Sequence, residues 1–346
     1  MAEIRTYEGD GSDLAELTNR VWRETVGGKM LFPLWDTEYF QWRLLDPRGG
    51  GSAFHVAAYE GSRIVGCLLA EPMRFEVCGR LVQGTLSSWM TVDPRVKSPR
   101  LALRMLTELR RRHQETNTSF SMGYAGPEAR PFWAALGKRP PHDLQVLDQI
   151  SFWARPFDSG MVAASGFSFV ERYGPALAKL LPGLRPKPRS PVREFKRSDL
   201  DRCHQWLDAQ SKGADLRILW SSSRLELQLA HSRIRTLLLE DGDKGGVINY
   251  YGIRMLGASE VQVGVIDIFA GTLSFTQQLA LLSAACRQME EEGIHMAVMM
   301  KAVSAPARVF LAAGFIPYPA GLDLFWFFAN PDLTTKPPVR YHILFG

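Results

Sequence analysis

Apolar residues recur in short runs along the first half of the chain, and turn-forming residues interrupt them, which is typical of β-strands. The pattern predicts strands at Ala53–Tyr59 and Arg63–Glu71 around a turn at Gly61, then a strand at Arg74–Gln83. A more uniformly apolar strand follows at Thr85–Val92. An amphipathic helix near the N-terminus precedes this group. The first half is therefore expected to be built around a sheet.

Helical spacing of apolar residues follows Val92. It predicts a helix at Arg100–Gln114, and the next elements are a strand at Ser119–Ala125 and a helix at Glu128–Leu136. A last strand is expected near Gln145–Phe152. Strands of mixed direction with helices packed on both faces indicate a three-layer α/β domain.

The second half of the chain repeats this order of elements. The strand Val265–Phe269 aligns with Ser88–Val92, and the helix Gln278–Glu291 aligns with Leu101–Gln114 without a gap. The same offset aligns two further pairs of segments, Ile294–Met300 with Asn117–Gly123 and Val309–Gly314 with Phe132–Gly137. Identity between the copies is low, so the order of elements is what supports the repeat. We expect two tandem copies of one α/β domain.

A proline-rich segment joins the two copies. Residues 180–191 hold four prolines, which disfavour helix and favour a stiff, extended spacer. A short helix at Phe169–Leu181 is expected just before it. The sequence therefore predicts three regions, which are a first domain at 1–157, a linker at 158–191 and a second domain at 192–346.

Composition and charge narrow the classes of function. The 346 residues carry a net charge of +5, which permits an acidic ligand, but no dense run of Lys and Arg is interleaved with aromatic residues. DNA is therefore not an expected partner. The uncharged stretch Ile268–Cys286 contains polar side chains that a bilayer would reject, so no membrane span is expected. The N-terminus has no apolar signal segment, and we expect a cytoplasmic protein.

The cysteines and the isolated aromatic and histidine side chains have ordinary structural interpretations. The four cysteines form no Cys-x-x-Cys pair and have no His cluster beside them, so neither a metal site nor a disulfide framework is expected. Trp35, Tyr39 and Trp42 have helical spacing, and such groups most often pack in a core. His55 is expected to be a structural histidine.

The segment from Val92 to Leu106 carries the clearest chemistry. A strand ends at Val92, and a helix begins near Pro99, where proline is accepted because the first N–H groups of a helix have no helical partner. Those N–H groups and the helix dipole favour an anion, and Lys97 and Arg100 add full positive charges. The pattern predicts a pyrophosphate site at the start of this helix.

This strand–loop–helix segment resembles the GNAT superfamily of N-acyltransferases, whose corresponding element reads V-x-P-x-x-[RQ]-x-x-G-x-[GA]-x-x-L-L. The residues that match in register are Val92, Pro94, Lys97, Ala102, Met105 and Leu106. The resemblance implies acetyl-CoA or another acyl-CoA as co-substrate, without a metal. The residues that it places against the co-substrate are Met90, Val92, Lys97, Ser98, Arg100, Leu101 and Ala102. Arg100 stands where the family has glycine, so its side chain either holds the phosphate directly or impairs the site.

The resemblance also implies how the reaction would proceed. Many members of the family use a tyrosine as general acid, but Trp133 stands at that position here and Phe310 stands there in the second copy. Tyr124 is the nearest substitute for the acid, and Glu71 is the candidate base, acting through water. The acceptor amine would attack the thioester directly, while a backbone N–H near Met90 polarises the carbonyl group.

The whole chain is expected to be an acyltransferase with a tandem GNAT-like fold, each copy having a mixed, mostly antiparallel sheet flanked by helices. The segment Tyr39–Arg43 resembles tandem members of the superfamily. The second-copy loop, Thr272–Gln278, has no basic residue, so that copy is expected to shape the cleft for a small-molecule amine acceptor rather than bind CoA. Two alternatives remain open. The donor would be an acyl carrier protein or an aminoacyl-tRNA in one, and in the other the chain is a non-catalytic CoA-binding or interaction protein.

Overall fold

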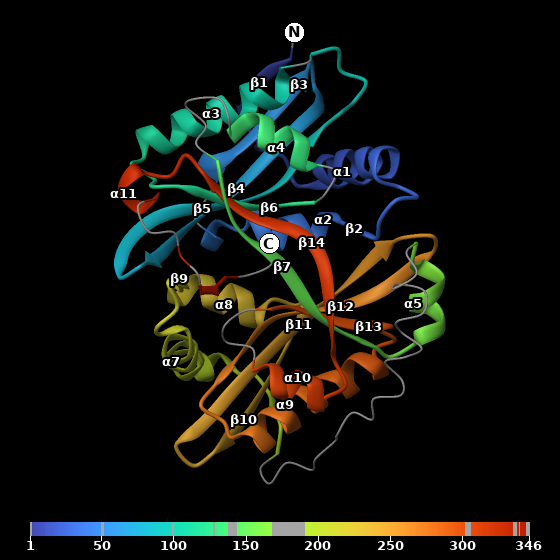
Figure 1. The fold of residues 1–346 in the computed structure, drawn as a ribbon, viewed down its shortest axis with the longest axis vertical. Coiled ribbons are helices and arrows are strands. Elements are labelled where there is room, and N and C mark those ends of the chain that lie inside the picture. Colours follow the sequence, from blue (N-terminus) through green and yellow to red (C-terminus); the bar gives the residue numbers. More distant parts are fainter. Residues whose placement is uncertain are drawn as a thin grey trace.

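The computed structural model describes residues 2–49, 52–98, 100–126, 129–137, 144–167, 191–301, 306–334, 338 and 340–343. The strands of these residues join one large, mostly antiparallel sheet, and helices cover its faces (Figure 1). The expected mixed α/β class is confirmed. The predicted helix Phe169–Leu181 lies outside the described residues, as do Pro99 and most of the proline-rich spacer.

The first half begins with an edge strand and an amphipathic helix. That helix forms because Leu14, Leu17 and Val21 recur at helical spacing and bury one face. The elements of this half are β1 (Glu3–Thr6), α1 (Ser12–Thr25), β2 (Phe32–Leu34), α2 (Thr37–Phe40), a π-helical turn (Gln41–Leu45), β3 (His55–Glu60), β4 (Arg63–Val77), β5 (Arg80–Val92), α3 (Leu101–Glu115), β6 (Ser121–Ala125), α4 (Arg130–Gly137), β7 (Gln145–Pro156) and α5 (Ser159–Ser165).

The second half repeats this order. Its elements are β8 (Arg193–Glu194), α7 (Leu200–Ser211), β9 (Leu216–Leu219), α8 (Ser222–Ala230), β10 (Ile234–Asp241), β11 (Lys244–Leu256), β12 (Glu260–Gly271), α9 (Phe275–Glu291), β13 (Met296–Met300), α10 (Ala307–Ala312), β14 (Ile316–Phe327), α11 (Pro331–Thr334) and β15 (Tyr341–His342). Helix α9 begins at Phe275, three residues before the predicted Gln278, because Ser274 and Gln277 form a capping box there.

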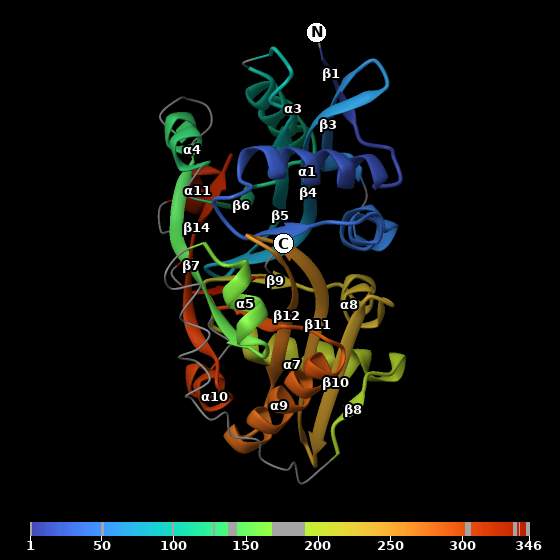
Figure 2. The ribbon, with the colours of Figure 1, turned by 90° about the vertical axis from the view of Figure 1, so that its right-hand side faces the viewer.

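The two halves exchange their last strands. The order across the sheet is β1-β3-β4-β5-β6-β14-β7-β13-β12-β11-β10-β8. Strand β14 of the second half therefore pairs with β6 of the first half, and β7 of the first half pairs with β13 of the second. Figures 1 and 2 show β7 and β14 running side by side from one half into the other. The exchange makes the two copies parts of one sheet.

A second exchange involves two short strands. Strand β2, which follows α1, pairs with β11 of the second half. Strand β9, which follows α7, pairs with β4 of the first half in the equivalent way. The helical segments that come next, α2 with its π-helical turn and α8, are therefore held against the opposite half, where both contribute to the candidate site described below.

The hairpin of the first half differs from the prediction. The three strands expected between Arg63 and Val92 are two long strands, β4 and β5, which turn at Cys78 and Gly79. Both turn residues have positive φ, as two-residue hairpin turns that match strand twist require. Pro72 does not end β4 because it lies between Leu69, the last residue paired with β3, and Arg74, the first paired with β9.

The buried hydrophobic residues of the described part of the chain form four clusters, and two of them lie where the two halves meet. One joins Phe75 and Leu86 to Leu225 and Ile268, and another packs α1 and α2 against β11 and β12. The other two lie under α3 and α4 and under α9 and α10. Each of these outer clusters takes an aromatic residue from an exchanged strand. The shared clusters place the contact between the halves in the interior of the molecule.

Candidate functional site

The loop between β5 and α3 holds the predicted phosphate contacts. Asp93, at the end of β5, is buried and forms an ion pair with Arg20 of α1 at 3.0 Å, which fixes the start of the loop. Tight turns follow, in which the N–H of Ser98 donates to Val96 O at 2.8 Å and the N–H of Leu101 donates to Ser98 O at 3.0 Å. The loop is thus compact where it enters the helix.

Lys97 and Arg100 lie at the start of α3 with exposed side chains. Among the described residues, neither has an ion pair with an acidic side chain, whereas the neighbouring Arg95 is paired with Glu24. Leu101 is buried, and Ser98 and Ala102 are partly buried. The helix therefore presents its first turn and two unneutralised cations at one place, which is the arrangement that suits a phosphate group.

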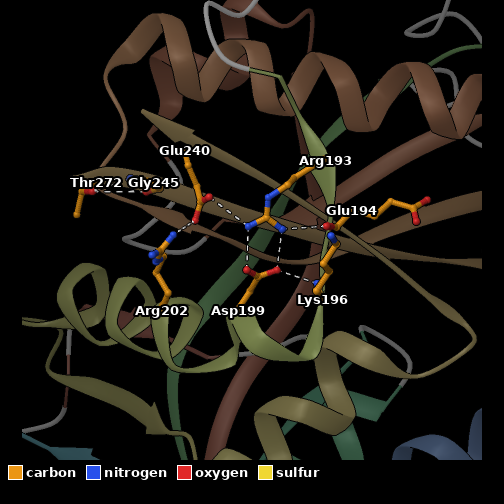
Figure 3. A network of polar contacts seen from close by, with 8 residues as sticks. All are labelled: Arg193, Glu194, Lys196, Asp199, Arg202, Glu240, Gly245 and Thr272. Atoms are coloured by element: carbon orange, nitrogen blue, oxygen red, sulfur yellow. Dashed lines mark hydrogen bonds and ion pairs between the residues drawn. The ribbon is translucent and has the colours of Figure 1, made fainter. Parts of the chain in front are cut away.

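The corresponding loop of the second half is occupied by its own contacts. The side chain of Ser274 accepts from the backbone of Gln277, and the Gln277 side chain accepts from the N–H of Ser274 at 2.9 Å. The N–H of Thr272 donates a hydrogen bond to Gly245 O at 2.8 Å, and Figure 3 shows these two residues in contact. First-turn donors of α9 are therefore used internally, and the loop carries no cation.

Figure 3 shows what stabilises the second half beside this loop. Arg193 of β8 donates to both oxygens of Asp199, at 2.7 and 2.8 Å, and to Glu240 of β10 at 3.1 Å. Arg202 of α7 also contacts Glu240. The network connects an edge strand, a helix start and β10 through charged hydrogen bonds, and each of its charges is matched. Its role is accordingly structural.

A β-bulge interrupts β5 beside the loop. Cys67 pairs with Thr91 and Leu69 pairs with Ser88, so two residues, Trp89 and Met90, stand opposite Leu68 alone. Trp89 has φ 55°, which is uncommon for a residue with a side chain. Extra residues at a bulge are left outside the regular ladder of hydrogen bonds. The bulge therefore sets Trp89 and Met90 outside the regular pairing with β4, in the segment where the sequence predicts a carbonyl contact.

A buried polar cluster lies where the two halves meet, and we call it the central polar cluster. It consists of Arg43 from the π-helical turn, Glu71 from β4, Arg224 and Gln228 from α8, and Asp267 from β12. Arg43 Nη1 donates to Gln228 Oε1 at 3.0 Å and lies 3.8 Å from Asp267 Oδ2. Gln228 Nε2 donates to Asp267 Oδ2 at 2.8 Å. Arg224 forms an ion pair with Glu71 and donates to Arg43 O at 3.3 Å.

The exchanged segments explain why these residues meet. Asp36 accepts the N–H of Tyr39 at 2.7 Å and so begins the helix that leads to Arg43. Ser221 accepts the N–H of Arg224 at 3.2 Å and begins α8 in the same way. Because β2 and β9 pair with the opposite halves, both helical segments face the contact between the halves.

The central polar cluster contains atoms without hydrogen-bond partners. The side chains of Arg43 and Asp267 are each 1% exposed, and that of Arg224 is 10% exposed. Within this cluster, the described buried atoms that have no hydrogen-bond partner are Nε and Nη2 of Arg43, Nε and Nη1 of Arg224, Oδ1 of Asp267, and Oε1 of Glu71, which is ion-paired with Arg224. Unmatched charged atoms are costly away from water. The cluster therefore holds several buried charged atoms that are not matched by hydrogen bonds within the protein.

Burial also changes the acidity of this cluster. It raises the pKa of Asp267 to about 6, although Arg43 acts in the opposite direction. Burial and the neighbouring Arg43 lower the pKa of Arg224 to about 9. Asp267 is therefore a carboxyl group that exchanges its proton near neutral pH, which is a property found most often at functional sites.

Tyr124 and Glu71, the predicted acid and base, both lie at this cluster. Burial raises the pKa of Tyr124, with Arg43 lowering it and Asp267 raising it further. Glu71 is held by Arg224. Tyr124 packs on the cluster that contains Leu324, whereas Trp133 packs on Phe325, with ring centroids 4.6 Å apart. Tyr124 is thus on the opposite face of the sheet from the position that Trp133 occupies.

The sequence missed much of the central polar cluster. Arg43 entered only as part of a motif, and Arg224, Gln228 and Asp267 were not singled out. One signal was present, because Asp267 is a charged residue inside the otherwise apolar segment Val265–Ala270. The other members come together through exchanged strands, and local sequence pattern does not encode that pairing.

The described residues contain no group of three or more His, Cys, Asp and Glu side chains placed to hold a metal ion. No helix among them is both long and apolar enough to cross a membrane.

The fold is similar to those of solved N-acyltransferases. A Saccharomyces cerevisiae N-myristoyltransferase with bound myristoyl-CoA and inhibitors matches with a TM-score of 0.74 at 15% identity, over 99% of this chain and 86% of that chain. Another structure of the yeast enzyme with bound myristoyl-CoA matches with a TM-score of 0.73 at 15% identity, over 100% and 89% of the two chains.

A GCN5-related N-acetyltransferase from Anabaena variabilis matches with a TM-score of 0.56 at 12% identity, over 94% of this chain and 72% of that chain. No protein-family description and no curated protein matches the sequence. The structural likeness nevertheless covers both halves and their exchanged strands. The chain therefore has a tandem GNAT-like fold, the fold of these N-acyltransferases.

Proposed function

We propose that the protein is an N-acyltransferase that transfers an acyl group from acyl-CoA to an amine. The observation that carries the proposal is the likeness, over 99% of the chain, to an N-myristoyltransferase crystallised with myristoyl-CoA. The exposed Lys97 and Arg100 at the start of α3 also support it, because the sequence predicts a pyrophosphate contact there.

The first half would bind the donor. Lys97 and Arg100 would contact the pyrophosphate together with the first turn of α3, near Ser98, Leu101 and Ala102. Met90 and Val92, both partly buried on β5, would lie along the thioester arm. The backbone at the bulge would donate to the thioester oxygen as negative charge develops on it. The second half lacks this arrangement and would help to hold the acceptor.

The reaction would be a direct transfer. The amine nitrogen forms a bond to the thioester carbon, the carbon–sulfur bond breaks, and CoA leaves as a thiolate. Positioning of the two substrates would supply most of the rate enhancement. Tyr124 is the candidate proton donor, but burial raises the pKa of its phenol and makes it a poorer acid, so the thiolate would leave without a proton from the protein.

Calorimetry and a thiol-release assay test the proposal. The full chain is titrated with CoA and with acetyl-, malonyl-, decanoyl- and myristoyl-CoA, and thiol release is then followed with a panel of primary amines. We expect binding of at least one ester and release that depends on the amine. Binding without release for every amine would favour a CoA-binding protein, and weak CoA binding beside tight binding of an acylated carrier protein would favour that donor.

A further inference from the structure

The atoms of the central polar cluster that have no hydrogen-bond partner indicate what kind of ligand would fit there. Four guanidinium nitrogens, two on Arg43 and two on Arg224, have N–H groups to donate and no acceptor. Two carboxylate oxygens have no hydrogen-bond donor, and since Oε1 of Glu71 is ion-paired with Arg224, Oδ1 of Asp267 is the one left for a ligand. These groups lie within one connected network, because Arg43 Nη1 is 3.8 Å from Asp267 Oδ2 and Arg224 donates to Arg43 O. A ligand that satisfies them must offer an acceptor, such as a carboxylate, close to a donor.

Contacts within the protein already match the other charges. Glu71 is occupied by Arg224, and Oδ2 of Asp267 accepts from Gln228 at 2.8 Å. Asn249 also contributes, because its side chain donates to Gln228 O at 2.9 Å and accepts the N–H of Ile268 at 2.7 Å, which fixes the strand beside Asp267. The free atoms therefore belong to side chains that are held in place.

Given the acyltransferase function proposed above, we propose that the central polar cluster binds the acceptor and that the acceptor is an amine with a carboxylate beside it, as in an amino acid. Arg43 and Arg224 receive the carboxylate, and Oδ1 of Asp267 receives the amine. Guanidinium groups pair with carboxylates through parallel hydrogen bonds, and such charged bonds are strong when buried. A neutral amide or a plain alkylamine would leave the guanidinium groups unmatched.

Asp267 also acts as the base in this arrangement. The ammonium form of the acceptor gives a proton to Oδ1, the freed nitrogen lone pair forms the bond to the thioester carbon, and the sulfur departs with the electrons of the broken bond. A second amine proton is then lost to water from the new amide nitrogen. Glu71, the base expected from the sequence, is paired with Arg224, and an ion-paired carboxylate is a weaker base than an unpaired one.

The experiment compares acceptors that differ only in the carboxylate. Leucine, leucinamide and isopentylamine, and likewise phenylalanine, phenylalaninamide and phenethylamine, are tested by calorimetry on the full chain and by thiol release from acyl-CoA. We expect each amino acid to exceed its amide and its alkylamine at least about tenfold in affinity and in kcat/KM. Amides or alkylamines that equal the amino acids in both measurements would overturn the inference.

This design separates the inference from the proposed function. If alkylamines support thiol release and amino acids do not, the acyltransferase function stands and the inference fails. If no amine supports release and no CoA ester binds, the function fails. In that case calorimetry still tests the inference. Tighter binding of the amino acid than of its amide would support it, and equal binding would overturn it.

Substitutions in the cluster give a second test. In Arg43→Gln and Arg224→Gln, the ratio of the affinity for the amino acid to that for its amide should fall close to one. The matched control Arg63→Gln, at an exposed arginine of β4, should keep the wild-type ratio. If the glutamine variants fail to fold, Arg43→Lys and Arg224→Lys retain the charge and should reduce the preference partly. Folded variants with an unchanged preference would contradict the assignment. Asp267→Asn should lose turnover while it keeps the preference in binding.

Discussion

Lys97 and Arg100 are the two side chains whose removal tests the donor site most directly. We expect Lys97→Ala and Arg100→Ala each to weaken CoA binding by roughly tenfold or more, because a charge-assisted contact to phosphate contributes about 1.5–3 kcal/mol. Calorimetry measures the affinity, with Lys244→Ala at an exposed hairpin lysine as control. Wild-type affinity in both single variants and in the double variant would remove these residues from the site.

The raised pKa of Asp267 makes stability depend on pH. Its pKa is 3.8 ordinarily and about 6 in the fold, so between these values the folded chain keeps a proton that the unfolded chain loses. The contribution of Asp267 to the free energy of unfolding should therefore fall as pH rises from 4 to 7, by an amount on the order of 3 kcal/mol. The charged and titratable groups that face Asp267 are Arg43, Arg224, Tyr39, Tyr124 and Tyr251. The pKa of Arg224 is lowered only to about 9 and burial raises the pKa of each tyrosine, so these four groups keep their charge over that range.

Urea unfolding of wild type and Asp267→Asn at pH 4 and pH 7 measures this effect. The asparagine variant should gain stability relative to wild type as the pH rises. Asp243→Asn, at an exposed turn, serves as the control and should follow wild type. If the free energy of unfolding changes by the same amount between pH 4 and pH 7 in wild type and Asp267→Asn, this carboxyl group keeps an ordinary pKa in the fold.

Tyr124 tests whether the leaving thiolate needs a proton from the protein. Burial raises the pKa of its phenol, which makes it a poorer acid, and a CoA thiolate leaves readily without one. We expect Tyr124→Phe to leave turnover within a few-fold of wild type and CoA affinity unchanged. Steady-state kinetics checks this with an identified acceptor, and a loss of about 10²-fold in kcat would instead make Tyr124 the general acid.

At the scale of elements, α3 and α9 start in different ways. The first turn of α9 is capped by Ser274 and Gln277, and its loop has no cation, so we expect one CoA site per chain. Calorimetric stoichiometry measures the number of sites. A value near two would mean that the second half binds CoA despite its capped helix.

The elements themselves were largely predictable from sequence because their signals are local. Helices α3 and α4 and strands β3 and β6 lie within a few residues of their predicted positions. The long β4–β5 hairpin was missed because a proline such as Pro72 normally marks the end of a strand. Pro72 is tolerated within β4 because it lies between the part of the strand that pairs with β3 and the part that pairs with β9, and only the structure shows this pairing. The loop with Lys97 and Arg100 was singled out from the same kind of local signal, and its contact with phosphate stays a prediction. Arg224 and Asp267, in contrast, meet only through the tertiary fold.

At the scale of the whole molecule, the exchanged strands join the copies that the sequence separates at 1–157 and 192–346. Strand β7 leaves the first half to pair with β13, and β14 returns to pair with β6. Outer hydrophobic clusters in both halves also take aromatic residues from the exchanged strands, Phe325 beneath α4 and Trp153 beneath α10. Each half thus depends on the other for a strand and for part of its core.

We therefore expect fragments 1–157 and 192–346 to fold poorly when they are expressed separately. Each would expose an unpaired strand edge and would lose the aromatic contacts that the other supplies. Coexpression of the two fragments should recover a soluble complex. Circular dichroism and thermal unfolding of each fragment check this, and a separate fragment that unfolds cooperatively near the temperature of the full chain would disprove the dependence.

The return of β14 to the first half also sets an order of events during synthesis. Strand β6 leaves the ribosome long before β14, and at about 5–20 residues per second the intervening chain takes roughly 10–40 s to make. Throughout that interval the edge of β6 that β14 will cover stays open. Newly made chains are therefore most exposed to aggregation and proteolysis before their last strands emerge, and any stop codon upstream of Ile316 would leave even the donor half incomplete.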